Sequence, residues 1–500
     1  MAYVRTVRTA SGATAVQIVY SSRRGSRDIE HIGSAHDEVE LEVLKAAARQ
    51  RMAAGQTQLD LGLDDAASGG GGVPLPITSS RMGHLWDALV RAFEVLGFDG
   101  DEVFRALVLA RIIEPTSKLD SLRVLGEAGI DPPSYRTLIR RLPVFAEQSW
   151  RQAVAAACAA HAGLGPASLV LYDVSTLYFE TDAGDGFREP GFSKERRLDP
   201  QITIGLLTDA SGFPLMVHAF EGNKAETATM LPVIEAFMQA HQLAGVTVVA
   251  DAGMISDANK RAIEAAGLSF ILGMRIPEVP YVVAQWRRDH PDEEIPDGHV
   301  FCQPWPAGPA DKRRDQVIYY QSRADRARRT LRGIDQQVAK AEKAVAGQAP
   351  VKRNRFIQLS GGTRKVNRTL EAKARALAGI KGYVTDLDAT GQFVIDAYHR
   401  LFQIEKSFRM SKHDLQARPI YHHKRDSIEA HLTIVFAALA VSRWIEDATG
   451  WSIKKFVRTT RRYRTIEIQA GAHTLTAAEP LSDDLHDALR TIHGDRGRAH

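Results

Sequence analysis

The stretch DAYHRLFQIEKSFRMSKHDL, residues 396–415, guides the interpretation of the rest of the chain. Its apolar residues recur at steps of three and four, which predicts one helix. One face of that helix would carry Tyr398, Leu401, Phe402, Glu405, Phe408 and Lys412. The carboxylate of Glu405 would then lie in an apolar stripe, where even a neutral polar group without a partner costs roughly 2–7 kcal/mol. Glu405 therefore needs a proton or a cation, and the cation is either Arg409 one turn later or a metal ion.

Length and composition predict a soluble intracellular protein of several domains. The 500 residues are 44% hydrophobic, which is enough for more than one core. The two cysteines, Cys158 and Cys302, have no spacing suited to zinc or to a disulfide framework. The N-terminus lacks an apolar signal region, and the richest apolar run, 432–442, is too short to span a bilayer. We therefore expect no membrane partner.

Positive charge is concentrated in two segments. Residues 311–370 hold 16 Lys and Arg against 5 Asp and Glu, a local charge of +11, whereas the whole chain carries +4. Residues 454–464 hold six basic side chains and no acidic one. Such segregation favours a polyanion partner, because neutralised phosphates release counterions. A solvated charged helix face remains the alternative for the first segment.

The order of predicted elements indicates an α/β fold, a mixed sheet flanked by helices and interrupted by a basic insertion. From residue 168 the pattern runs strand, strand, strand, helix, strand, helix, strand, and a helical region precedes it. The predicted parts are 1–63 (small β-meander plus helix), 64–76 (linker), 77–165 (helical, helix-turn-helix-like DNA-binding region), 166–276 (core, first part), 277–379 (basic insertion), 380–450 (core, second part) and 451–500 (basic C-terminal tail).

Residues 119–142, LDSLRVLGEAGIDPPSYRTLIRRL, read as a helix, a glycine-containing turn and a second helix that begins at Ser134. The second helix carries Arg136 and Arg140. A helix-turn-helix that lays its second helix on DNA has this form. Plain packing of two amphipathic helices explains the pattern equally well.

Two buried strands end in an aspartate, LVLYDVS at Asp173 and VTVVADAG at Asp251. Ligands of open α/β sheets commonly bind at such strand ends, although a turn or cap role explains each aspartate alone. Asp209 and Asp386 also end strand-like runs, and Asp209 is explained by an apparent hairpin turn. Three carboxylates on three elements can hold two Mg²⁺ or Mn²⁺ ions about 3.5–4 Å apart. Such a pair of ions would also give Glu405 its cation.

The order Asp173, Asp251, Glu405, with an insertion before the last, resembles the DDE triad of bacterial insertion-sequence transposases, which have an RNase H-like core. The spacing of seven in Tyr398–Glu405–Lys412 is similar to the Tyr-Arg-Glu-Lys signature of one transposase subgroup. That signature has an Arg where this chain has Leu401, and the adjacent Arg400 lies about 100° round the helix. Segments 111–122, 191–207, 250–256 and 418–423 also resemble parts of those enzymes.

The resemblance implies a DNA transposase that cuts at terminal inverted repeats and transfers the 3′-hydroxyl into target DNA. Asp173, Asp251 and Glu405 would ligate two Mg²⁺ or Mn²⁺ ions. The expected DNA contacts are Tyr398, Lys412, Arg400, Arg409, Lys194, Arg136 and Arg140. A homodimer or larger assembly on DNA, in the bacterial cytoplasm at the nucleoid, is also implied. The alternatives are a metal-dependent nuclease without strand transfer and a catalytically silent DNA-binding protein of transposase descent.

Overall fold

The computed structural model forms two compact units, Met1–Pro74 and Leu75–His500. The boundary between them falls inside the predicted linker. The residues that the structure describes are 2–9, 13–21, 27–53, 75–98, 100–165, 167–181, 183–191, 199–241, 245–254, 256–350, 354–360, 363–418, 420, 422–470 and 473–494.

The first unit is the predicted meander with its helix. Its elements are β1 (Ala2–Arg8), β2 (Thr14–Ser21), β3 (Arg27–Ala35) and α1 (Glu38–Ala53). The three strands pair antiparallel in chain order, and α1 covers them by packing against the buried side chains of Val16 and Ile18. The predicted turns at 11–12 and 24–25, and most of the 64–76 linker, lie outside the described residues.

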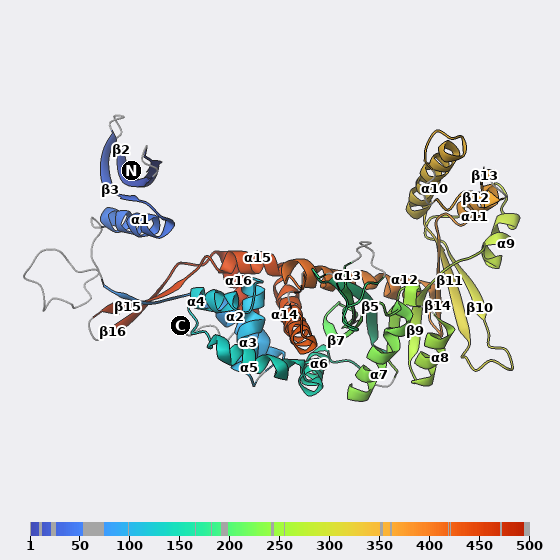
Figure 1. The fold of residues 1–500 in the computed structure, drawn as a ribbon, viewed down its shortest axis with the longest axis horizontal. Coiled ribbons are helices and arrows are strands. Elements are labelled where there is room, and N and C mark those ends of the chain that lie inside the picture. The colour runs from blue at the N-terminus through green and yellow to red at the C-terminus, as the bar shows by residue number, and fades with distance from the viewer. Residues whose placement is uncertain are drawn as a thin grey trace, which may run out of the picture. The chain divides into compact units, whose positions relative to one another are not determined.

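The second unit is built on one mixed sheet, as the sequence predicted (Figure 1). Its strands are β5 (Leu169–Tyr178), β6 (Gln201–Asp209), β7 (Pro214–Glu221), β8 (Thr247–Ala250), β9 (Ser269–Met274), β10 (Val300–Trp305), β11 (Gln316–Ser322) and β14 (Ile380–Thr385). They lie in the order β10-β11-β14-β9-β8-β5-β6-β7. The antiparallel β5–β6–β7 meander followed by β8 and β9, parallel to β5, is the RNase H-like arrangement.

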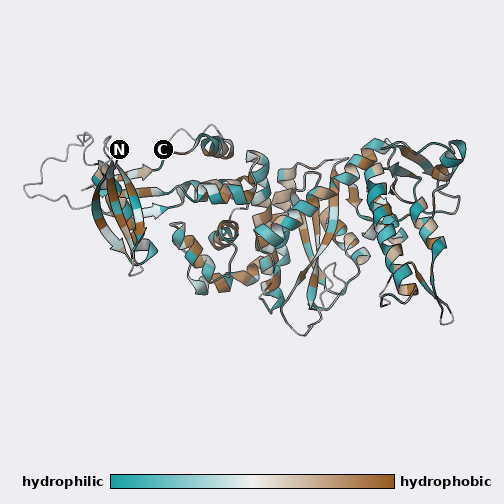
Figure 2. Ribbon diagram, turned by 90° about the horizontal axis from the view of Figure 1, so that it is seen from above, coloured by the Kyte–Doolittle hydropathy of each residue, from teal (hydrophilic) through white to brown (hydrophobic). Residues whose placement is uncertain are grey.

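The hydrophobic pattern explains which strands are central. All four residues of β8 are buried, as expected for a strand covered on both faces. The sharp β6–β7 turn relies on Gly212, whose φ of +90° suits glycine. Figure 2 shows hydrophobic residues concentrated in the strands of this sheet.

Five helices precede the sheet, in the region 77–165 that the sequence predicted to be helical. They are α2 (Gly83–Val95), α3 (Glu102–Ile113), α4 (Asp120–Glu127), α5 (Tyr135–Ala146) and α6 (Gln148–Ala162). The side chains of Asp101 and Ser134 cap α3 and α5 by accepting bonds from backbone N–H groups. The two helices of the predicted helix-turn-helix both form, but α5 packs chiefly against the later helix α14 (Arg425–Thr449).

Helix α14 lies between this helical region and the sheet (Figure 1). It contains the apolar run 432–442, and by length and composition alone it could cross a membrane. In the structure 89% of its most apolar window is buried inside the protein, as in a core helix. Elements between the strands complete the core layers: η1 (Glu226–Ala228), α7 (Met230–His241), η2 (Ala252–Met254) and α8 (Asp257–Ala265).

The basic insertion is less separate from the sheet than expected. Strands β10 and β11 extend the core sheet through the pairing of β11 with β14, although the sequence led us to assign all of 277–379 to an insertion. The remainder forms its own small core around Ile334, Val338 and Phe356. Its elements are α9 (Tyr281–Asp289), α10 (Ala324–Val345), β12 (Ile357–Ser360), β13 (Thr363–Val366) and α11 (Arg368–Ala376).

Residues 451–500 are not simply a basic tail, because most of them are folded into the second unit. Strand β15 (Thr465–Ala470) pairs with β4 (Ile77–Arg81) and β16 (His473–Ala478). Helices α15 (Ile453–Thr460) and α16 (Asp483–His493) bury one apolar face each against α2 and α14. Basic side chains cover the other face of α15. The finer division of residues 75–500 into parts stays a prediction.

Candidate active site

The two aspartates lie beside each other at the edge where β8 ends. The prediction that the first strand also ends at its aspartate is wrong, because β5 continues past Asp173 to Tyr178. Strands β5 and β8 are parallel and pair as far as Tyr172 and Ala250, so Asp173 and Asp251 occupy the next position on each strand. Neighbouring positions on paired strands face the same side of a sheet. Asp173 is half-buried, whereas Asp251 is exposed. This edge therefore presents two carboxylates side by side.

Tyr398 approaches the same edge from helix α12 (Gly391–His399). Its side chain is 5% exposed, and its hydroxyl donates a hydrogen bond to Oδ1 of Asp251. Burial raises the pKa of Tyr398, and the bond to Asp251 raises it further, so the phenol stays protonated and donates. The close approach depends on Gly273 in β9, where an added Cβ would lie 2.5 Å from the Tyr398 Oη.

Lys381, at the start of β14, is a member of the site that the sequence did not reveal. Its Nζ lies 4.2 Å from the centre of the Tyr398 ring and 5.7 Å from that of Tyr383, which are cation–π distances. Burial lowers the pKa of Lys381, while the charges of Asp251 and Glu405 act to raise it. One ammonium group thus interacts with both carboxylates.

The predicted single helix over 396–415 is wrong. The chain forms α12, then α13 (Leu401–Arg409), then a π-helix, η3 (Met410–Asp414). Between α12 and α13 the hydrogen bonds reach back three residues instead of four, from the Arg400 N–H to the Ala397 carbonyl and from the Gln403 N–H to the Arg400 carbonyl. This 3₁₀-type turn interrupts the α-helix. A wide bond from the Leu415 N–H to the Met410 carbonyl adds a residue to the last turn.

These breaks change the face on which each side chain lies. Ile404 and Ser407 form the buried side of α13, while Glu405 is exposed, so the expectation that Glu405 lies in a buried apolar stripe is wrong. The alternative ion pair is also not formed, since in the part of the chain that the structure describes no salt bridge joins Glu405 to Arg409. Helix α13 packs against β5, which brings Glu405 to the sheet near the aspartates.

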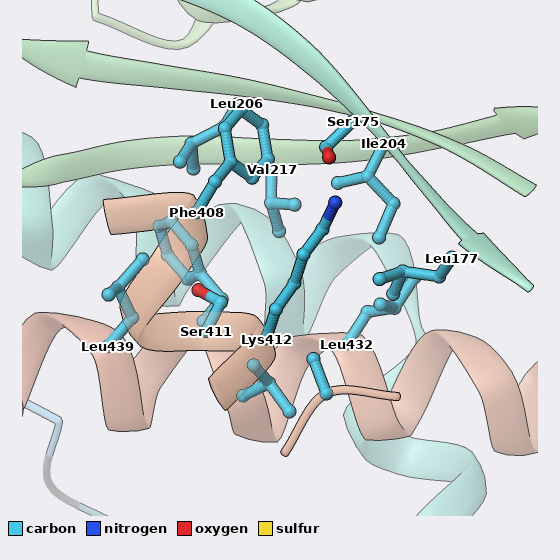
Figure 3. Close-up of a pocket in the computed structure, with 13 residues that line it drawn as sticks. Ser175, Leu177, Ile204, Leu206, Val217, Phe408, Ser411, Lys412, Leu432 and Leu439 are labelled. Atoms are coloured by element: carbon cyan, nitrogen blue, oxygen red, sulfur yellow. The ribbon is translucent and has the colours of Figure 1, made fainter. Parts of the chain in front are cut away.

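Lys412 lies in a small apolar cavity of about 40 Å³ beneath β5 (Figure 3). Its stem passes between aliphatic side chains, and its amino group points toward Ser175 (Figure 3). Ser175 is two residues beyond Asp173 and therefore on the same face of β5. Lys412 thus faces the sheet from the same side as Asp173. Its expected contact with DNA stays a prediction.

The two other strand-end aspartates have structural partners. Asp209 accepts bonds from the N–H groups of Ser211 and Phe213, which confirms its turn role. The fully buried side chain of Asp386 accepts from the Phe270 N–H at 2.8 Å and from Arg314 at 3.1 Å. These bonds explain both residues without catalysis.

Glu226 is a second residue that the sequence did not single out. Its Oε2 lies 2.9 Å from the position that a Cβ on Gly253 would occupy, two residues after Asp251. Asn259 joins the two loops by donating to the carbonyls of Thr227 and Met254 at 2.8 and 2.9 Å. A loop that follows β7 therefore supports the loop that carries Asp251.

Positive side chains form a groove of about 380 Å³ beside the acidic edge, where α10 and β11 meet α12. Arg323, Arg326 and Arg329 of the insertion line it, together with His399 and two carboxylates, Asp325 and Asp396. Burial, then the charges of Lys381 and Arg326, lower the pKa of His399, as expected in a positive field. This groove therefore suits a polyanion that extends from the acidic edge.

The remaining predicted DNA contacts are placed as follows. Arg400 and Arg409 are exposed on either side of Glu405, and Arg136 and Arg140 are exposed on α5. Lys194 lies outside the described residues.

A metal site is supported by the kind of donors present. Carboxylate oxygens are the ligands that Mg²⁺ and Mn²⁺ prefer, and Asp173 and Asp251 present them side by side. Among the described residues, however, no three His, Cys, Asp or Glu side chains lie close enough together to hold an ion. The charge of Glu405 acts on Lys381, as does that of Asp251. The donor chemistry of the two aspartates fits divalent ions, whereas Glu405, the predicted third ligand, does not complete a three-residue site with them.

Residues 165–441 match the family of the transposase DDE domain. The match covers more than half of the chain, and the chain therefore belongs to this family. Members are DNA phosphoryl-transfer enzymes that generally use divalent metal ions and bind DNA. No curated protein matches the chain. Among solved structures, the cryo-EM piggyBac transposase synaptic complex with hairpin DNA is similar at a TM-score of 0.40 and 10% identity, covering 76% of this chain and 78% of that one. A likeness at this level has no bearing on function.

Proposed function

We propose that this protein is the transposase of a bacterial insertion sequence. It cuts phosphodiester bonds at terminal inverted repeats and joins the freed 3′-hydroxyl to target DNA. Asp173, Asp251 and Glu405 are its catalytic residues and would hold two Mg²⁺ or Mn²⁺ ions. The observation that carries the proposal is the adjacent placement of Asp173 and Asp251 at the edge that α13 approaches with Glu405.

The chemistry is phosphoryl transfer, in which positioning and charge stabilisation supply most of the catalysis. When bound, the ions would activate the attacking oxygen and stabilise the leaving one. Tyr398 holds Asp251 in place through its hydroxyl, and Gly273 lets Tyr398 come close enough to do so. The groove lined by Arg323, Arg326 and Arg329 would guide the DNA backbone toward this edge.

Within the family we place the chain in the Tyr-Arg-Glu-Lys subgroup, because Tyr398, Glu405 and Lys412 keep its spacing. Leu401 stands at the position of the signature Arg, and its side chain is only half-buried. Lys381 supplies the positive charge that Leu401 lacks, since it interacts with both Asp251 and Glu405. The protein acts on DNA in the bacterial cytoplasm, as a homodimer or larger assembly that holds two ends together.

Cleavage of a labelled duplex tests the proposal. The duplex carries the inverted repeats that flank the coding sequence, and wild type, Glu405→Gln and Asp251→Asn are compared with Mg²⁺. We expect wild type to cut and join, and each variant to lose at least 100-fold in rate while keeping its Tm and DNA affinity. Asp386→Asn is the matched control, since Asp386 has structural partners; it should cut at the wild-type rate.

The products separate the alternatives. Cutting without joined products would indicate a nuclease, and binding without cutting by wild type would indicate a silent DNA-binding protein. Equal rates for wild type and Glu405→Gln would remove Glu405 from the reaction.

A further inference from the structure

A second group of positive side chains lies away from the acidic edge. Lys118 follows α3, and its Nζ lies 2.7 Å from Nε2 and 3.0 Å from Nδ1 of His422. The ring of His422 lies 5.5 Å from that of His431 on α14, whose Nε2 is 3.2 Å from the Ala417 carbonyl oxygen. Arg111, in the last turn of α3, is near enough for its charge to act on both Lys118 and His422.

Among the described residues, no carboxylate is paired with the cations of this group. Burial and the charge of Arg111 lower the pKa of Lys118 to about 8, and burial with Lys118 and Arg111 lowers that of His422 to about 4. Burial also lowers the pKa of Arg111 to about 10. In the part of the chain that the structure describes, no carboxylate forms an ion pair with Arg111 or Lys118. Both remain charged at neutral pH, whereas His422 is neutral.

The nearest acidic residues in sequence are already paired elsewhere. Glu114 and Asp120 flank Lys118, and Arg123 binds both, with N–O distances of 2.6 and 2.8 Å. Glu429, two residues before His431 on α14, pairs with Arg151. The protein thus keeps two partly buried cations close together while their potential counterions are held by other groups. Such an arrangement disfavours the folded chain alone and favours an added anion.

We propose that Arg111, Lys118 and His422 form a binding site for one phosphate of the DNA backbone. A guanidinium fork and an ammonium group suit phosphate oxygens. Neutral His422 accepts from Lys118 and holds its ammonium group in place, since both ring nitrogens lie within 3.0 Å of Nζ. That the phosphate belongs to DNA rests on the proposed function.

The course of the chain supports a link to the active site. Ala417 lines the cavity that holds Lys412, and its carbonyl bonds to His431. Arg418 lies over the ring of Tyr178, at the end of β5, at 5.3 Å. Ala417 and Arg418 therefore connect the surroundings of Lys412 and β5 with His431, whose ring neighbours that of His422.

Two measurements test the site, and neither requires cleavage. The first is the salt dependence of binding to the inverted-repeat duplex in EDTA, by fluorescence anisotropy, for wild type, Lys118→Met and Arg490→Gln. We expect Lys118→Met to weaken binding about 10-fold and to reduce the slope of log K against log salt by about one. Arg490→Gln removes an exposed charge on α16 that pairs with Asp487 and should change neither.

The second measurement distinguishes DNA from free phosphate. Inorganic phosphate, compared with chloride at equal ionic strength, should raise the Tm of wild type and not that of Lys118→Met. A phosphate response with an unchanged DNA slope would mean an inorganic anion site and overturn the DNA assignment. No phosphate response together with an unchanged slope would overturn the site altogether. Failure of wild type to bind DNA at all would instead refute the proposed function.

Discussion

Replacing Gly273 by Ala tests how Tyr398 is held against Asp251. The new Cβ would lie 2.5 Å from Oη, 2.8 Å from Cε2 and 2.9 Å from Cζ of Tyr398, whereas ordinary contacts begin near 3.4 Å. The ring must therefore move by about 1 Å. It is 5% exposed and packs edge-on to Tyr383 at 5.0 Å, so little space is open to it.

The expected cost follows from these contacts. Overpacking a well-packed site costs about 1–3 kcal/mol, and loss of the Tyr398 bond to a carboxylate adds about 1.5–3 kcal/mol, less where the acceptor is exposed as Asp251 is. We expect Gly273→Ala to lower the free energy of unfolding by about 2–4 kcal/mol in urea denaturation. DNA cleavage should fall at least 10-fold at a temperature where the variant is folded.

Two comparison variants isolate the cause. Gly333→Ala, in α10, places a Cβ in open space and should be neutral or stabilising by up to about 1 kcal/mol. Tyr398→Phe removes the closest atom, so its combination with Gly273→Ala should cost less than the sum of the two single changes. The reasoning is refuted if Gly273→Ala matches Gly333→Ala in both stability and cleavage, because Tyr398 would then not lie against β9.

Further predictions concern charges. Lys381→Met should slow cleavage at least 10-fold with DNA affinity nearly unchanged, and Lys381→Arg should recover part of the rate; a drop in affinity equal to the drop in rate would show a DNA contact instead. Lys118→Met should raise the Tm without DNA or phosphate. The pKa of Lys118 is lowered on folding to about 8, so the penalty is full below pH 8 and fades as pH rises toward the usual lysine value; the Tm gain should do the same. Arg136→Gln and Arg140→Gln should each reduce the salt slope of DNA binding by about one, while changing stability by less than about 0.5 kcal/mol; unchanged slopes would leave α5 a packing helix.

The sequence was sufficient for the strands and for the neighbouring aspartates. The short apolar run VTVVA, bounded by turn residues, is typical of a buried strand, and β8 stops where the run stops, whereas β5 continues past Asp173 to Tyr178. Parallel pairing of β5 and β8 then places Asp173 beside Asp251. Strand β10 was harder to assign to the sheet, because this edge strand buries less and its alternation is interrupted by Pro304 and Trp305. Strand β11 is well buried, but it lies in the basic segment that we assigned to an insertion.

Periodicity failed where the helix phase changed. The pattern of 396–415 assumes 3.6 residues per turn throughout, whereas the chain tightens at Arg400 and widens after Met410. These are backbone events, set by how α12 and α13 each dock on the sheet, and no residue type in the stretch marks them. Lys381 was missed for a different reason, since a lysine at the start of a strand has no distinguishing pattern. Its role depends on Tyr398, which is close in space and not in sequence.

The change of phase also alters how the positive side chains relate to the acidic edge. A regular helix would have aligned Tyr398, Glu405 and Lys412 along the DNA; instead Tyr398 points down to Asp251, and Lys412 passes through an apolar cavity toward Ser175. Lys412 and Lys381 therefore approach the edge from different elements, η3 and β14. Lys381 is placed to balance the charges of Asp251 and Glu405, which would otherwise repel one another. In the proposed function, DNA contact would fall to the exposed cations, the insertion arginines of the groove above all, and the +11 charge of residues 311–370 would serve the same function as the acidic edge.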